Sequence, residues 1–136
     1  MSNSTEQNKA IVRRFNKECL EQGIPASFEE LLADGVINHS APPGRPNGKE
    51  SFYFFLNEVL RKGFPDVEVE IIEQIAENDL VTTRKKIRGT HLGEVLGHPP
   101  THRRVEFNVI DIIRLKDGQY QEHWGQTDFL EVLRQL

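Results

Sequence analysis

The sequence predicts an α+β fold in which N-terminal helices precede an antiparallel sheet. Apolar residues recur at helical spacing in the first half of the chain. In the second half they alternate with polar residues at the strand period of two. Between two of these alternating segments stands "KDGQ", which is typical of a tight hairpin turn. Helices grouped before strands, rather than interleaved with them, indicate the α+β class.

Two helices are expected first. One spans residues 4–23, where a stripe that includes Phe15 recurs at helical spacing and Gly23 provides the C-terminal stop. A shorter helix is expected to start with Ser27 as its N-cap and to end at Gly35.

A loop and a third helix follow. Residues 38–48, "NHSAPPGRPNG", contain three prolines and two glycines, which indicates a loop. The third helix spans residues 49–63 and carries Phe52 and Phe55 on its apolar side. It ends before Pro65, because a proline pushes the preceding residue out of helical geometry.

The second half is predicted to form a four-stranded antiparallel meander and a last helix. The strands are expected at residues 67–75, 80–91, 105–115 and 119–127, and the helix at 128–136. No repeat or shift in composition divides the chain, so residues 1–136 are expected to form a single domain.

Composition argues against several function classes. The net charge is −4 and no block of basic residues occurs, so no nucleic-acid partner is expected. No apolar run is long enough for a membrane span, and the first ten residues lack the apolar segment of a signal peptide. The single cysteine, Cys19, fits a reducing compartment. We therefore expect a cytoplasmic protein that binds neither nucleic acid nor membrane.

Two stretches near the C-terminus carry a family resemblance. "GTHLGEVLGHPPTHRRVEF" and "VIDIIRLKDGQYQEHWGQTDFLEVLRQL" closely resemble the SnoaL-like polyketide cyclase family. That family shows a G-T-H-x-G-x-x-x-G-x-P-P-T-G-[RK] loop followed by D-I-x-R-x-x-D-G-x-[IV]-x-E-x-W-x-x-x-D. The resemblance extends upstream through "VRRFNKECLEQG", "VINHSAP" and "GFPD", and so covers nearly the whole chain.

The resemblance implies a cone-shaped fold like that of nuclear transport factor 2. In this fold a curved antiparallel sheet wraps around the N-terminal helices and encloses an internal cavity, and homodimers are usual. The best-known members close a polyketide ring by an intramolecular aldol reaction without metal or organic cofactor. No cofactor and no metal are therefore expected, and the expected ligand is a small apolar carbonyl compound. A shared fold does not by itself fix the function.

The sequence departs from the cyclase pattern at the catalytic positions. The anthracycline cyclases carry their catalytic aspartate seven residues after the turn glycine, and Gly125 stands there in this chain. Their histidine on the partner strand corresponds to Asp111, their glutamine to Val109, and the asparagine of their third helix to Phe55. The usual cyclase acid is thus replaced.

Asp111 and His123 form the candidate catalytic pair. If "KDG" closes as a type I turn with a bulge, Asp111 lies opposite His123, close enough for their side chains to touch. A two-residue turn would place Asp111 opposite Trp124 instead. A carboxylate beside an imidazole in an apolar cavity is a reasonable acid/base pair. The alternative is a structural pair that only holds the hairpin.

Several other polar residues have two interpretations. Asp128 has the position of an N-cap for the last helix. His39 stands before the loop and either contacts ligand or bonds loop backbone. His98 and His102 flank two prolines, so they cannot form the helical two-histidine metal site. Three basic residues alternate along the expected second strand: Arg84, Lys86 and Arg88. They indicate either an anion site or a strand face that is solvated or forms an interface.

The favoured function is a cofactor-free cyclase or isomerase with Asp111 and His123 as acid/base pair. The expected ligand pocket is lined by His39, Phe15, Phe52, Phe55, Val109 and Gly125. The alternative is a non-catalytic module that only binds a small ligand, which the replacement of the cyclase aspartate favours.

Overall fold

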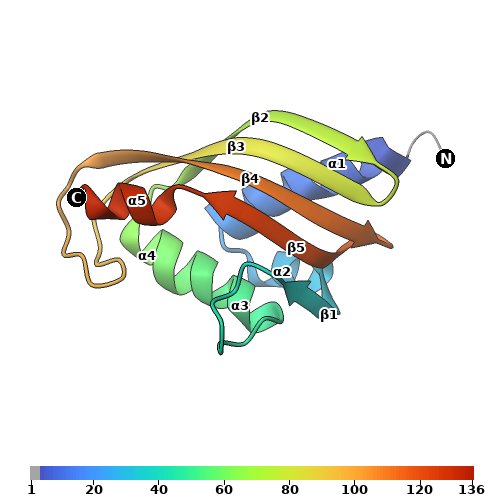
Figure 1. The fold of residues 1–136 in the computed structure, drawn as a ribbon, viewed down its shortest axis with the longest axis horizontal. Coiled ribbons are helices and arrows are strands. Elements are labelled where there is room, and N and C mark those ends of the chain that lie inside the picture. The colour runs from blue at the N-terminus through green and yellow to red at the C-terminus, as the bar shows by residue number, and fades with distance from the viewer. Residues whose placement is uncertain (1–3) are drawn as a thin grey trace.

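The computed structural model describes residues 4–136, in which helices cover one face of a five-stranded sheet (Figure 1). The helical segments are α1 Ser4–Phe15, η1 Asn16–Glu21, α2 Pro25–Leu31, α3 Lys49–Tyr53, η2 Phe54–Leu60, α4 Arg61–Gly63 and α5 Phe129–Arg134. The strands are β1 Leu32–Asn38, β2 Glu68–Glu77, β3 Leu80–Thr90, β4 Arg104–Lys116 and β5 Gln119–Thr127. Their order in the sheet is β1-β5-β4-β3-β2. None of the helices in residues 4–136 is long and apolar enough to cross a membrane.

The α+β class and the four-stranded antiparallel meander β2–β5 are confirmed, but the sheet has a fifth strand that was not predicted. Residues 32–38 form β1, which pairs in parallel with β5 at the edge of the sheet, so the second helix ends at Leu31 and not at Gly35. Ser27 is not its N-cap: Pro25 opens the helix, and the Ser27 hydroxyl donates to Glu18 Oε1 at 2.6 Å. A parallel pairing with a strand far along the chain leaves no local turn signal for sequence reasoning to find.

The first and third helices each contain a wide π turn. In the first, Asn16 Nδ2 donates to the carbonyl oxygen of Val12 at 2.9 Å. That carbonyl lies four residues before Asn16, so this side-chain bond spans one turn of the helix. The Asn16 side chain is buried as a result, and its oxygen remains available to the sheet.

The core fills the space between the helices and the inner face of the sheet. Its largest fully buried side chains come from both layers, and they include Phe28, Leu31, Leu60, Phe64, Phe107 and Ile113. Phe15 of α1 stacks on Tyr120 of β5 with their ring centroids 4.4 Å apart. The helices are therefore fixed on the sheet by aromatic contacts near the start of β5.

The β4–β5 hairpin has neither of the two registers expected from sequence. Asp117 and Gly118 both have positive φ, 54° and 75°, and form a two-residue turn between Lys116 and Gln119. A bulge then shifts the pairing by one residue, so that Asp111 lies opposite Gly125 rather than opposite His123 or Trp124. Because the bulge interrupts the alternation of β5, Tyr120 and His123 both point to the inner face.

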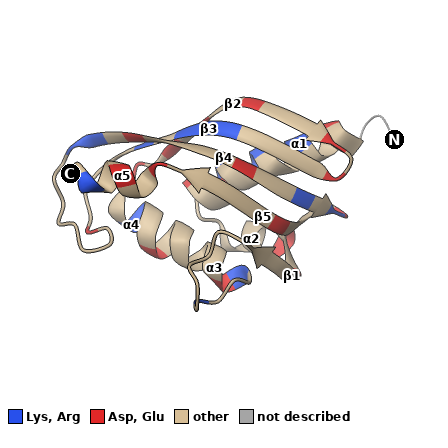
Figure 2. Cartoon of the chain, in the orientation of Figure 1, with Lys and Arg blue, Asp and Glu red and all other residues tan. Residues whose placement is uncertain are grey.

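Charged residues recur along β2, β3 and β4 (Figure 2), and the alternating bases of β3 pair with carboxylates of the neighbouring strands. Arg84 pairs with Glu73, Arg88 with Glu70 and Glu106, and Lys86 with Glu106. The three alternating bases of β3 are thus neutralised by neighbouring strands. This arrangement is the solvated strand face, and it argues against an anion site.

Candidate active site

A buried polar cluster lies on the inner face of the sheet, centred on Asp111 of β4. Lys85 stands one step away diagonally on β3, and His123 stands one step away diagonally on β5. The side chains of Asp111 and Lys85 are both 7% exposed, whereas 19% of the His123 side chain is exposed. The histidine is therefore the member of the cluster that a ligand reaches first.

One carboxylate oxygen of Asp111 faces both bases. Asp111 Oδ2 lies 3.3 Å from Lys85 Nζ and 3.7 Å from His123 Nε2. The second distance is longer than a hydrogen bond, so the contact is electrostatic. Lys85 Nζ also donates to Asn16 Oδ1 at 2.6 Å, while Asp111 Oδ1 is buried without a hydrogen-bond partner among residues 4–136.

The charges of this cluster favour an ionised Asp111. Burial raises the pKa of the Asp111 carboxyl, but the Lys85 ammonium and His123 more than offset this effect and hold the pKa below its usual value. The aspartate is therefore an anion at neutral pH, and Lys85 is its buried counter-ion. His123 lies at the edge of this pair, next to a fixed negative charge.

The imidazole of His123 is held on two further sides. Its Nδ1 lies 2.9 Å from Asn38 Oδ1, at the end of β1. The ring of Phe52 meets it edge-on, with centroids 5.7 Å apart and an interplanar angle of 73°. The ring orientation is thus fixed from the sheet edge and from helix α3, and Nε2 is directed toward Asp111.

The absence of a side chain at Gly125 makes room for this ring. A Cβ atom added to Gly125 would lie 3.1 Å from His123 Cε1 and 3.3 Å from His123 Nε2. The Ser40 hydroxyl accepts from the Gly125 N–H at 2.8 Å and donates to the Gly125 carbonyl at 3.2 Å, which anchors the strand there. The His123 ring therefore packs directly against the Gly125 backbone, and a larger residue at position 125 would crowd it.

The remaining residues predicted to line a pocket lie in different surroundings. Phe15 and Phe52 are buried in the interior, and Val109 is partly buried on the inner face. Phe55 is 37% exposed and packs edge-on against Phe129. Three of the four apolar residues predicted to line the pocket therefore lie in the interior, and Phe55 does not.

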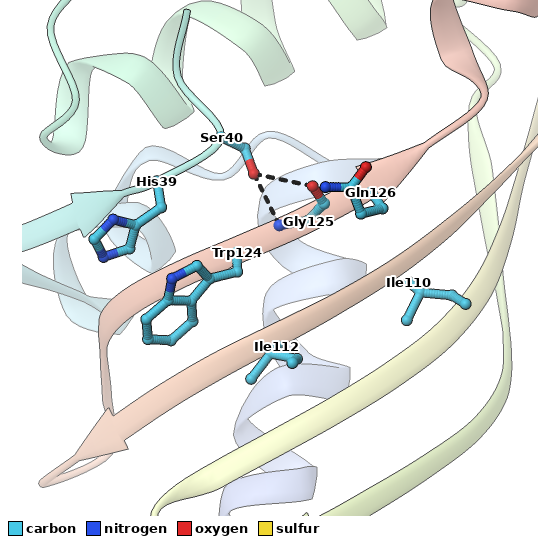
Figure 3. A pocket seen from close by; sticks show the side chains of 7 residues that line it. All are labelled: His39, Ser40, Ile110, Ile112, Trp124, Gly125 and Gln126. Atoms are coloured by element: carbon cyan, nitrogen blue, oxygen red, sulfur yellow. Dashed lines mark hydrogen bonds between the residues drawn. The ribbon is translucent and has the colours of Figure 1, made fainter.

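His39 lies on the other side of the sheet from the cluster. Its Nε2 is 2.8 Å from Glu122 Oε2, and its ring stacks on Trp124 with centroids 4.8 Å apart. Together with Ile110 and Ile112 these rings line a shallow hollow on the outer face (Figure 3). His39 and His123 therefore do not share one site.

Three members of the cluster escaped sequence reasoning: Lys85, Asn16 and Asn38. Lys85 alternates with Val81 and Ile87, both buried, so the strand period gave a signal that it faces inward. Asn16 had no such signal, because the π turn directs it, and Asn38 lies on a strand that the sequence did not reveal.

Asp128 has the N-cap position of α5, but its carboxylate does not cap the helix. Instead Oδ1 accepts from the Asn108 N–H at 2.7 Å and Oδ2 accepts from Asn108 Nδ2 at 3.1 Å. It therefore ties the end of β5 to β4. Among residues 4–136, no group of three or more His, Cys, Asp or Glu side chains is arranged to hold a metal ion.

Replacing Lys85 by Met should destabilise the fold by about 3–5 kcal/mol at neutral pH, because it leaves Asp111 buried and unpaired. In this variant burial raises the folded-state pKa of Asp111 above the unfolded value, so the loss should shrink as the pH falls. In the wild type the pKa is lowered instead, and the contribution of Asp111 is lost only as the pH falls below about 4. Urea unfolding across this pH range measures both effects.

Lys86→Met is the matched control, because Lys86 is the adjacent lysine and faces solvent beside Glu106. It should change stability little. Equal losses in the two variants would contradict a buried Lys85–Asp111 pair.

Comparison with known proteins agrees with the fold. The family model described as SnoaL-like polyketide cyclase matches residues 10–136. Aklanonic acid methyl ester cyclase DnrD of Streptomyces peucetius is 26% identical over 136 residues, covering 100% of this chain and 92% of that protein. Nogalonic acid methyl ester cyclase of Streptomyces nogalater is 40% identical over 48 residues, 35% of this chain and 36% of that protein.

Solved structures give the same assignment. IdmH of Streptomyces antibioticus superposes with a TM-score of 0.82 at 30% identity, covering 95% of this chain and 97% of that one. A SnoaL-like polyketide cyclase of Agrobacterium tumefaciens, at 19% identity and a TM-score of 0.71 over 94% of this chain and 96% of that one, shares the fold. The protein belongs to the SnoaL-like polyketide cyclase family.

Proposed function

We propose that the protein is a cofactor-free acid/base enzyme whose substrate is a small, largely apolar carbonyl compound, and that His123 is its base. The observation that carries this proposal is the position of His123 Nε2. It lies 3.7 Å from the buried carboxylate of Asp111, and 19% of the His123 side chain is exposed. A base needs both a group that stabilises its protonated form and access to the substrate.

The proposed reaction begins when Nε2 removes a proton from a carbon next to a carbonyl group. The new imidazolium is stabilised by the Asp111 carboxylate, which Lys85 keeps ionised. The enolate then attacks a second carbonyl of the same molecule, which closes a ring, or takes a proton back at another carbon, which isomerises the substrate. The imidazolium returns the proton in either case.

The surroundings of the base fit an apolar substrate. Phe15, Phe52 and Val109 supply apolar walls on the helix and sheet sides of the cluster. Apolar walls exclude water and so strengthen the charge interactions of the base. The names of relatives refer to methyl ester cyclases, and this supports a carbonyl-bearing substrate without fixing which one.

A second candidate is a binding module without catalysis. Gly125 occupies the position at which the anthracycline cyclases carry their aspartate, and this replacement favours it. In that case the polar cluster would orient a ligand and stabilise the fold only. The two functions differ in whether the protein moves a proton of the bound compound.

Exchange of α-protons separates these two functions. The wild type should accelerate deuterium incorporation into an aryl methyl ketone such as 2-acetylnaphthalene, followed by NMR. His123→Gln should lower this acceleration by about 10²-fold or more, the usual contribution of a general base, and should leave the ketone affinity nearly unchanged. His39→Gln, on the outer face, is the control and should exchange at the wild-type rate.

Retained exchange in His123→Gln would exclude this residue as the base. Binding of the ketone without accelerated exchange in the wild type would favour the binding module.

We also propose that the protein forms homodimers through the outer face of the sheet. Ile110 and Ile112, 50% and 36% exposed, lie on this face and line one shallow hollow with Trp124. Contiguous exposed apolar residues of this kind mark association surfaces.

We propose in addition that the protein works in the reducing cytoplasm. The thiol of Cys19 is free and buried, and burial raises its pKa to about 12, so it suits a compartment without disulfide chemistry.

Sedimentation equilibrium tests the dimer. The wild type should sediment as a dimer, and Ile110→Lys should shift it toward the monomer because a charge would be buried in the interface. Leu130→Lys is the control, since Leu130 is exposed on α5, away from the sheet face. A wild type that stays monomeric would refute the dimer.

A further inference from the structure

The hydrogen bonds around Asn38 determine which nitrogen of His123 carries a proton. We infer that Asn38 is a positioning residue: it holds His123 with a hydrogen on Nδ1 and leaves the lone pair of the neutral ring on Nε2. The two residues are register partners in the parallel β1–β5 pair. The significance for catalysis rests on the proposed function, whereas the protonation pattern itself does not.

The orientation of the Asn38 amide follows from its neighbours. The backbone N–H of Ser40 donates to Asn38 Oδ1 at 3.0 Å, and a backbone N–H only donates, so the atom it meets is the oxygen. At the other end, Asn38 Nδ2 lies 3.2 Å from Ser51 Oγ. The Ser51 hydroxyl gives its hydrogen to the Gly48 carbonyl at 2.6 Å, so its oxygen accepts from the amide.

The protonation of His123 follows from the same oxygen. Nδ1 of His123 lies 2.9 Å from Asn38 Oδ1. Two acceptors cannot form a hydrogen bond, so Nδ1 carries the hydrogen, both in the neutral ring and in the imidazolium. The proton that His123 gains and loses is therefore the one on Nε2. That nitrogen lies 3.7 Å from Asp111 Oδ2 and next to the backbone of Gly125.

Asn38 is needed because Asp111 favours the other tautomer. A hydrogen on Nε2 would point toward a carboxylate, and the lone pair of Nδ1 would then face Asn38 Oδ1. The shorter contact, 2.9 Å against 3.7 Å, lies on the Asn38 side. Without the Asn38 oxygen the carboxylate has no competitor, and the hydrogen should move to Nε2, where it would block the base.

Nitrogen NMR of the histidine rings tests this assignment without any substrate. In ¹⁵N-labelled wild-type protein at alkaline pH, once the ring signals no longer change with pH, His123 should show a protonated Nδ1 and an unprotonated Nε2. Asn38→Leu removes the oxygen at similar size and should reverse this pattern. Asn38→Asp retains an acceptor at the same place and should keep it. His123→Gln assigns the signals.

Ser51→Ala is the matched control. It removes the partner of Asn38 Nδ2 but leaves the oxygen held by Ser40, so the wild-type pattern should persist. A wild type with the hydrogen on Nε2 would overturn the inference, as would Asn38→Leu with an unchanged pattern. Reversal in Ser51→Ala would also overturn it, since loosening of the loop and not loss of the oxygen would then set the tautomer.

Activity gives the second readout. Asn38→Leu should lower kcat of the exchange reaction by about 10²-fold or more, with little change in KM, since a wrong tautomer removes the base without removing the pocket. Asn38→Asp should recover most of this loss. A reversed tautomer with unchanged kcat would show that Asn38 positions His123 but that His123 is not the base, which refutes the proposed function alone.

Discussion

The buried ion pair between Lys85 and Asp111 constrains much of the structure around it. Two charges taken out of water are costly unless each finds good partners. Lys85 donates to Asn16 Oδ1 at 2.6 Å, and Asn16 stands at the start of the π turn of the first helix. The amide of Asn16 is also fixed by its bond to the Val12 carbonyl, so the helix presents a held oxygen to the lysine. The same pair keeps the negative charge of the Asp111 carboxylate close to Nε2 of His123.

The position of His123 depends on two features of strand β5. The bulge after Tyr120 turns both that residue and His123 to the inner face, where the first stacks on Phe15 and the second meets Phe52. Strand β1, which pairs in parallel with β5, then places Asn38 beside Nδ1 of the His123 ring. Aromatic packing, an irregular strand and an edge strand together orient one imidazole, and the absence of a side chain at Gly125 makes room for its ring.

Sequence periodicity was sufficient for the α+β class, for the hairpin turn at Asp117 and Gly118, and for the inward face shared by Asp111, His123 and Gly125. The register was wrong in both of its expected forms, because a bulge has no local signature in a strand of polar and aromatic residues. Strand β1 was missed since its partner lies at the far end of the chain, and Asn38 was missed with it. Lys85 could have been found: it has the parity of its buried neighbours, Val81 and Ile87, but the exposed bases around it drew the interpretation to the other face.

The most direct measurement of the central claim is a crystal structure of the protein with 2-acetylnaphthalene bound. The account predicts the ketone in the interior, next to Gly125, with the carbon beside its carbonyl about 3–3.5 Å from His123 Nε2, the distance of a reactive contact. A ketone seated in the outer hollow between His39 and Ile112, with His123 untouched, would contradict it.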